Sequence, residues 1–568
     1  MTPSYFDTAE IPSGVTIIGD ILGIIGESND SSPSKAIENS LSSRAALFET
    51  LTQAVGVFVV VIKKPDETIV YASPESGGLF FNGTKFSEEE QKLVSFNEEL
   101  NPQSGLYFLV SRVNVPFFQG LYKQVHRLPG GFAAVVTNSA TRYVFPFTPL
   151  PGGAHTRYEG FIDTWKKVLR IYGDRPVALS GGVDSVFICA LMNELGVLSR
   201  VFHYSRGVHQ QAVAEKVSSY FEVPLLVRDT YADQKDVVER FYQSMTATYN
   251  IFGSGNWNHL QQSVEFHNFK SVYLGETMDS LYMIHNNASS TNTAEQNQRG
   301  AHSIGFVQDS VINNVPDFRR FLLSIMQSRV KSKSIVPFRY LNEEDALLEP
   351  DEKLLFLDYI EAQFAVIRES LVEEVDAAWF VRAVNFVRYS SAQSTRLRAQ
   401  SAVTDVEFLL PALSGPLLKQ YLSMHLEWDS CLMPKRFQYE YLDRVGMPFR
   451  QFVEESRASG KPKKLRNVLK SPRRFPGILF KYLTCKTRAR IDQRLENWSI
   501  LSRHLAQREL SGLEGPALKY IERVIEKVQS GDLGAMERFE VENLIHYLIY
   551  TSSARKDCAV PRQSNLEL

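Results

Sequence analysis

The sequence is poor in cysteine. Four cysteines occur among the 568 residues, Cys189, Cys431, Cys485 and Cys558, and no two of them form a CxxC pair. Zinc clusters and disulfide frameworks need cysteines at short, repeated spacings, so the sequence argues against both kinds of site. This cysteine usage is typical of a reducing compartment, and we expect a cytoplasmic protein.

Long apolar runs and a strong net charge are also missing. No run of about 18 apolar residues occurs, and no basic stretch leads into an apolar core near the first residue. The formal net charge of -2 gives no overall attraction to nucleic acid or to an anionic membrane. We therefore expect no membrane partner, and the charge argues against nucleic acid as the main ligand.

Length and composition predict a globular protein with more than one domain. A chain of 568 residues exceeds one ordinary core, and 44% hydrophobic with 22% charged residues is typical of globular proteins. Residues 146–155 are rich in proline and glycine, as linkers are. We expect a β-rich domain over residues 1–150, an α/β domain over 151–485, and a helical extension over 486–568 that packs on the α/β domain.

One stretch has the pattern of a phosphate-binding turn. The apolar run 177–179 predicts a buried strand, and apolar residues at helical spacing follow over 186–195. Between them lie Ser180, Gly181, Gly182, Val183, Asp184 and Ser185. Glycines let backbone N–H groups approach an anion, and the helix N-terminus adds a favourable dipole. Asp184 suits a Mg²⁺ ion, which proteins hold with one or two carboxylates plus phosphate oxygens.

A second stretch repeats this arrangement. Residues 271–274 predict a strand that ends at Gly275, and Glu276 and Asp279 follow directly. Further strands and helices alternate over 200–227, which predicts a doubly wound parallel sheet with its ligands at the carboxyl ends of the strands. Two carboxylates from neighbouring strand ends could share a divalent ion there, and a third could accept a proton.

These two stretches carry a family resemblance. Residues 180–185 resemble the SGGxDS pyrophosphate loop of ATP pyrophosphatases, and residues 275–281 resemble the SGEGADEL loop of asparagine synthetases. The resemblance implies an adenine nucleotide α-hydrolase-like synthetase domain that uses ATP and Mg²⁺. It implies nucleotide contacts at Ser180, Gly181, Gly182, Asp184, Ser185 and Gly275. Asp184 and Asp279 would hold the metal, and Glu276 would assist proton transfer.

Two further catalytic positions are implied by a looser match. Residues 406–411 resemble part of the family stretch LExRxPFLD, which makes Glu407 a candidate member of the acid–base set. Relatives place a lysine over the α-phosphate and the tetrahedral intermediate. Lys463 lies at about the right separation from Glu407, and Lys435 and Lys464 are its rivals.

The N-terminal part resembles a glutaminase that has lost its nucleophile. A hairpin over 56–72, the sequence Gly-Leu-Phe-Phe at 78–81 and the turn at 127–131 resemble the glutaminase (Ntn) domain of asparagine synthetases. Working members use an N-terminal cysteine, whereas Thr2 stands here and no cysteine precedes Cys189. We therefore expect a degenerate domain that does not hydrolyse glutamine. β-Lactam synthetases and lasso-peptide cyclases share this loss.

Together these features predict an ATP-dependent, AMP-forming amide ligase. The expected reaction adenylates a substrate carboxylate and joins it to an amine that does not come from glutamine. An intramolecular lactam or macrolactam closure of a peptide or small molecule in natural-product (antibiotic) biosynthesis fits best, with a precursor-peptide-processing protein as a possible partner. Two alternatives stay open: amidation of a small acid with free ammonia, and an RNA-directed or non-catalytic role. The low-complexity tract 286–300, the basic segment 461–494 and the oligomeric state are left unassigned.

Overall fold

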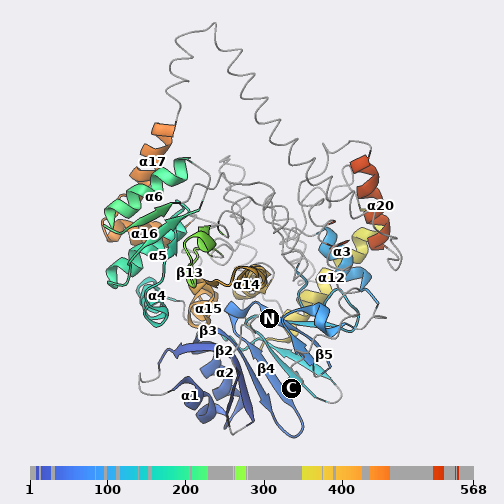
Figure 1. Ribbon diagram of the computed structural model, residues 1–568. Helices are drawn as coiled ribbons and strands as arrows, with labels where there is room; N and C mark the ends of the chain where they lie inside the picture. The colour runs from blue at the N-terminus through green and yellow to red at the C-terminus, as the bar shows by residue number, and fades with distance from the viewer. Residues whose placement is uncertain are drawn as a thin grey trace.

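The computed structural model describes residues 8–227, 263–278, 348–460 and 516–529 apart from short gaps, together with Leu260, Leu544, Tyr547 and Leu548. Thr2, Asp279, Lys463 and Lys464 lie outside the described residues, as do the tract 286–300 and the basic segment 461–494. The architecture is mixed α/β, with antiparallel sheets in the N-terminal region and a parallel sheet after it (Figure 1).

A six-stranded antiparallel sheet forms the centre of the N-terminal region. Its order is β1 (Thr8–Ile11), β2 (Val15–Ile24), β3 (Ala54–Lys63), β4 (Thr68–Ala72), β8 (Ala133–Val136) and β9 (Thr141–Val144). The predicted hairpin is confirmed, because β3 pairs with β4 in antiparallel register. Alternate residues of β3 face opposite sides of the sheet, and both sides are covered, so the strand is apolar and buried up to Ile62. Phe58 and Val60 pack with helix α2 (Arg44–Gln53), whereas Val59 and Val61 belong to the main core.

A smaller antiparallel sheet lies beside the first. Its order is β6 (Lys85–Ser87), β5 (Gly78–Asn82) and β7 (His126–Pro129). The short helical turn η1 (Pro74–Ser76) connects β4 to β5, and all three of its residues are buried. This turn faces the rest of the chain, where helix α14 (Ala392–Thr404) lies between the antiparallel part and the parallel part (Figure 1).

The parallel sheet follows the predicted doubly wound pattern. Its five strands are ordered β12 (Leu225–Val227), β11 (Val201–His203), β10 (Val177–Ala178), β13 (Ser271–Tyr273) and β14 (Glu407–Leu409), and all neighbours are parallel. The chain runs outward from β10 to β12 and then returns to the other side of β10 at β13. The carboxyl ends of β10 and β13 therefore flank the point where the strand order reverses, which is where open α/β sheets bind ligands.

Two helices, α5 (Val183–Glu194) and α6 (Val208–Tyr220), pack on this sheet, and α4 (Tyr158–Tyr172), α16 (Arg436–Arg444) and α17 (Phe449–Gly460) pack on these two helices. Three others contact the N-terminal region or one another: α12 (Pro350–Glu369) contacts β9, α15 (Gly415–Leu422) contacts β3, and α13 (Ala377–Asn385) contacts both α12 and α15. Helix α5 is buried from Ser185 to Met192, because it lies between the sheet and the helices α4 and α16. Among the described residues, no helix is long and apolar enough to cross a membrane.

The last described helix contacts the N-terminal region as well as the expected part of the chain. Helix α20 (Pro516–Gln529) contacts α3 (Pro102–Val110) of the N-terminal region, and Tyr547 packs on Phe108 of the same helix with ring centroids 5.7 Å apart. Arg523 of α20 also pairs with Glu352 of α12. The C-terminal part therefore returns to the N-terminal region as well as contacting α12, which its amphipathic pattern alone did not indicate.

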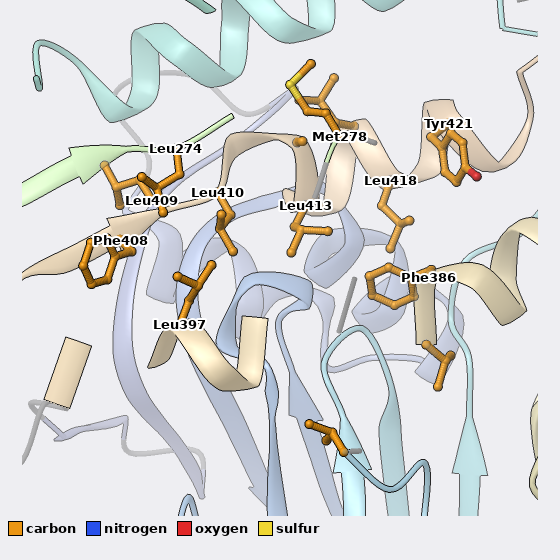
Figure 2. Packing of buried hydrophobic residues seen from close by; sticks show 14 of the residues in the cluster. Leu274, Met278, Phe386, Leu397, Phe408, Leu409, Leu410, Leu413, Leu418 and Tyr421 are labelled. Atoms are coloured by element: carbon orange, nitrogen blue, oxygen red, sulfur yellow. The ribbon is translucent and has the colours of Figure 1, made fainter. Parts of the chain in front are cut away.

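A buried apolar cluster supports the strand ends. Leu274 after β13 lies beside Leu409 of β14, and Leu397 of α14 belongs to the same buried cluster (Figure 2). Met278 is fully buried and belongs to the same cluster. Met278 therefore anchors the second loop in the core, and the partly buried Glu276 lies at the edge of this cluster.

Candidate active site

The first loop forms as the sequence predicts. Leu179 follows β10 and is buried, Gly182 is the N-cap of α5, and Asp184 lies in the first helical turn. Gly181 has a φ of +78°, and a Cβ there would lie 2.7 Å from the carbonyl oxygen of Gln210 in α6. Only glycine fits both the left-handed conformation and this close approach.

The two serines of the loop close its turn. The Ser180 hydroxyl accepts a hydrogen bond from the N–H of Gly182 at 3.3 Å, and the Ser185 hydroxyl donates to the carbonyl of Gly182 at 3.0 Å. The two Oγ atoms are 3.3 Å apart. The first N–H groups of a helix have no partner within the helix, so this turn presents donors at the carboxyl end of β10.

The second loop packs directly on the first. A Cβ on Gly275 would lie 2.8 Å from the backbone nitrogen of Ser185 and 3.2 Å from the Cβ of Asp184. No larger residue fits there without moving α5. Glycine at this position therefore brings the two strand ends into backbone contact, and the structure joins the two stretches that the sequence singled out.

Asp184 is held by two side chains of α16. The Nζ atom of Lys435 lies 2.6 Å from Oδ2 of Asp184, and Nε2 of Gln438 donates to Oδ1 at 2.8 Å. Lys435 caps the N-terminus of α16 with a left-handed φ of 59°, and its side chain is 23% exposed. Of the three lysines considered from the sequence, Lys435 is the one that the described residues contain, and it lies in the site.

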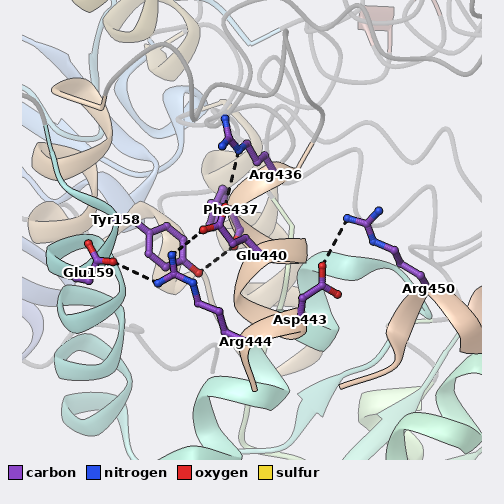
Figure 3. Close-up of polar contacts among 8 residues, drawn as sticks. All are labelled: Tyr158, Glu159, Arg436, Phe437, Glu440, Asp443, Arg444 and Arg450. Carbon is purple, nitrogen blue, oxygen red and sulfur yellow. Dashed lines mark hydrogen bonds and ion pairs between the residues drawn. The ribbon is translucent and has the colours of Figure 1, made fainter. Parts of the chain in front are cut away.

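Packing on both sides fixes the position of α16. The Phe437 ring meets Phe187 of α5 and Phe161 of α4 edge to face, each with ring centroids 5.4 Å apart. Figure 3 shows the outer side, where Arg444 lies 4.2 Å over the Tyr158 ring and pairs with Glu159 and Glu440. A helix held this way presents Lys435 and Gln438 to Asp184 at a defined distance.

Glu276 lies at the other side of the site. The Nε2 atom of Gln393, on α14, donates to Oε1 of Glu276 at 3.0 Å, and the Gln393 side chain is buried. Tyr204 follows β11 at the same edge of the sheet. Burial raises the pKa of Tyr204 above its ordinary value, and the negative charge of Glu276 raises this pKa further. Tyr204 therefore stays a neutral hydroxyl near Glu276 throughout the physiological range.

Glu407 is not part of this cluster, which corrects the sequence expectation. It begins β14 and pairs with Ser271, the first residue of β13, so it lies at the amino end of the sheet. Its N–H donates to the carbonyl of Lys270 at 2.9 Å. Its charge acts instead on Glu75 and Tyr172. A carboxylate at the start of a parallel strand cannot reach ligands at the strand's other end.

Three site residues were missed from the sequence: Gln393, Gln438 and Tyr204. The sequence could have indicated Tyr204, because this residue directly follows a predicted strand at the ligand-binding edge of the sheet. The two glutamines come from helices far along the chain and carry no motif. Within the described ranges no group of three or more His, Cys, Asp or Glu residues gathers into a metal site, and Asp279 lies outside those ranges.

In comparisons with known proteins, no family model matches this chain, and no curated protein sequence matches it either.

Proposed function

We propose that this protein is an asparagine-synthetase-like ligase that adenylates a carboxylate with ATP and then forms an amide. The proposal rests on one observation: the Ser180–Ser185 loop and Gly275 are in backbone contact where the strand order reverses, with Asp184 and Glu276 on either side. A phosphate-binding turn, a carboxylate, a lysine and a second carboxylate are the groups that such a reaction needs.

The first half-reaction uses the first loop and α16. The phosphates of ATP bind the N–H groups that open α5, and Lys435 places a positive charge beside them. An oxygen of the substrate carboxylate attacks the α-phosphorus, and the bond to the β-phosphate oxygen breaks. The products are an acyl-adenylate and pyrophosphate.

The carboxylate of Asp184 is a suitable ligand for Mg²⁺. Both carboxylate oxygens already face donors, the Nζ of Lys435 and the Nε2 of Gln438, so the group is oriented to take a cation. One carboxylate plus phosphate oxygens is a usual Mg²⁺ environment, and Asp279 would be the second protein ligand. When bound, the ion would neutralise charge on the leaving pyrophosphate.

The second half-reaction uses Glu276. The substrate amine attacks the acyl carbon, AMP leaves, and the proton lost by the amine passes to the Glu276 carboxylate. Gln393 and Tyr204 border this carboxylate. A carboxylate placed beside the acyl carbon is a suitable general base for this step.

The cysteine content of the sequence supports an amine that does not come from glutamine. Cys189 is the first cysteine of the sequence, and it is fully buried inside α5. Burial raises the pKa of its thiol, so it is not a nucleophile. We propose a degenerate glutaminase-type domain and an amine carried by the substrate itself, as in lactam or macrolactam closure of a peptide or small molecule.

Product analysis tests this function. Purified protein is incubated with ATP, Mg²⁺ and a panel of peptides that carry both a free amine and an Asp or Glu side chain. We expect AMP and pyrophosphate in equal amounts with a peptide 18 Da lighter. ADP as the product would contradict adenylation, and product that requires added ammonium would instead favour amidation of a small acid.

A further inference from the structure

Three consecutive side chains at the start of α14 reach three different groups. Gln393 donates to Oε1 of Glu276 at 3.0 Å, Ser394 donates to the carbonyl of Glu75 at 2.5 Å, and Thr395 donates to the carbonyl of Gly77 at 2.7 Å. All three side chains are buried. Neighbouring helix residues point about 100° apart, so one helical turn joins the second loop to the N-terminal region.

The contact with the N-terminal region is tight. Gly77 has a φ of +78°, and a Cβ there would lie 2.5 Å from the backbone nitrogen of Thr395. The buried guanidinium of Arg127 donates to the carbonyl of Gly77 at 2.7 Å and to the Thr395 hydroxyl at 2.8 Å. It also donates to the carbonyl of Pro116 at 2.8 Å. These bonds fix the position of α14 along its own axis, and its rotation about that axis, relative to η1.

The chemistry of Gln393 suits a carboxylate that must accept a proton. An amide N–H stabilises the ionised form of the carboxylate and fixes its orientation, yet it carries no charge that would suppress its basicity as strongly as a lysine would. Because Gln393 is buried, its rotamer is set by packing and by the anchoring of its two neighbours.

We propose that Gln393 is a positioning residue for Glu276, and that the N-terminal region sets its place through the contact of Gly77 and Arg127 with Thr395. This inference rests on the proposed function. It gives the N-terminal region a role in amide formation without any glutaminase activity: the region holds the helix that orients the proton acceptor. The adenylation step, which uses Asp184 and Lys435, does not depend on Gln393.

The experiment separates the two half-reactions in the full chain. ATP–pyrophosphate exchange reports adenylation, and formation of the lighter peptide reports amide formation, both with the amine-and-carboxylate peptides as probes. In Gln393→Leu we expect exchange within about twofold of wild type and amide formation slower by about 10- to 100-fold. The acidic limb of its pH–rate profile moves up by about one unit, since the carboxylate has lost a donor.

Further variants distinguish positioning from stability. Gln393→Asn keeps the amide but shortens its reach, so it should behave like Gln393→Leu. Thr395→Val removes the anchoring hydroxyl. It should leave ATP–pyrophosphate exchange near the wild-type rate and slow amide formation, but less than Gln393→Leu does. Gln451→Leu is the matched control, because Gln451 donates to Glu455 at 2.7 Å on the exposed side of α17. It should change neither reaction.

Three results would overturn the inference. Equal loss of exchange and amide formation in Gln393→Leu would show that the residue only stabilises the fold. Unchanged amide formation and an unmoved pH profile would show that it does not position Glu276. A wild-type protein without exchange on any probe would overturn the proposed function itself, and this inference with it.

Discussion

Lys435 and Asp184 lie 251 residues apart in the chain and meet in an ion pair of 2.6 Å between Nζ and Oδ2. Both side chains are largely shielded, with 23% and 14% of their surfaces exposed. The pair links the first turn of α5 to the N-terminus of α16. Under the proposed function, Lys435 would turn to the phosphates of ATP, and Asp184 would turn to a magnesium ion.

Loss of the Lys435 charge should weaken adenylation. Lys435→Met removes the cation beside the phosphates, and we expect ATP–pyrophosphate exchange to fall by about 100-fold, in the range found for a lost electrostatic contact in a shielded site. Lys123→Met is the control, since Lys123 pairs with Glu99 at the exposed surface. Exchange unchanged in Lys435→Met would remove this lysine from the proposed phosphate site and leave Lys463 and its rival Lys464 as the candidates.

A methyl group on Gly181 should disrupt the first loop. Gly181→Ala must hold a φ of +78° and place its Cβ 2.7 Å from the carbonyl oxygen of Gln210. We expect the free energy of unfolding to fall by about 2 kcal/mol, together with a loss of ATP binding. Gly196→Ala is the matched control, because Gly196 has a φ of +69° with no atom within 4 Å of an added Cβ. If the two variants lose equal free energy of unfolding in urea, the left-handed backbone conformation accounts for the loss and the contact with Gln210 does not.

A methyl group on Gly275 tests the contact between the two loops. Gly275→Ala pushes on the backbone of Ser185, and we expect exchange to drop by at least about tenfold, since small displacements of reacting groups are costly. Gly160→Ala, in α4 with open space around the position, serves as the control and should leave exchange unchanged. Normal exchange in Gly275→Ala would mean that the loops need not touch.

A buried acid at the junction of the two regions should make stability depend on pH. Burial raises the pKa of Glu75 to about 8, against the lowering effects of the Tyr172 hydrogen bond and the Arg398 charge; Glu407 raises it further. The Tyr71 and Tyr172 hydroxyls are neutral neighbours. Because the folded protein binds this proton more tightly than the unfolded chain, stability present at low pH is lost as the pH rises toward about 8.

The matching variant is Glu75→Gln, which keeps the shape and removes the ionisation. We expect its free energy of unfolding in urea to decline less than that of wild type between pH 5.5 and pH 8.5. Glu49→Gln, at an exposed ion pair with Lys419, should follow the wild-type curve. Parallel curves for wild type and Glu75→Gln would show that Glu75 is not the titrating group.

Local patterns in the sequence predicted the parts of the site that depend on local structure. The Ser180–Ser185 turn follows from a strand, two glycines and a helix in immediate succession, and Gly275 and Glu276 follow from the same rule at the next strand end. The doubly wound order also follows, since alternating strands and helices leave few other topologies.

Contacts between distant segments could not be predicted in this way. Gln393 and Gln438 reach the site because helices α14 and α16 pack there, and a buried glutamine has no characteristic spacing in the sequence. A short motif makes Glu407 a candidate, but the motif does not give the direction of its strand. Once β14 is seen to run parallel to β13, its first residue falls at the amino end.

ATP–pyrophosphate exchange with Mg²⁺ is the most direct test of adenylation. It would compare wild type, Asp184→Ala and Asp443→Ala, the last removing an exposed carboxylate of α16 that faces Arg450 (Figure 3). Adenylation predicts exchange that requires one carboxylate substrate, disappears in Asp184→Ala and persists in Asp443→Ala. Exchange that survives in Asp184→Ala, or a wild-type protein that does not bind ATP with Mg²⁺, would contradict it.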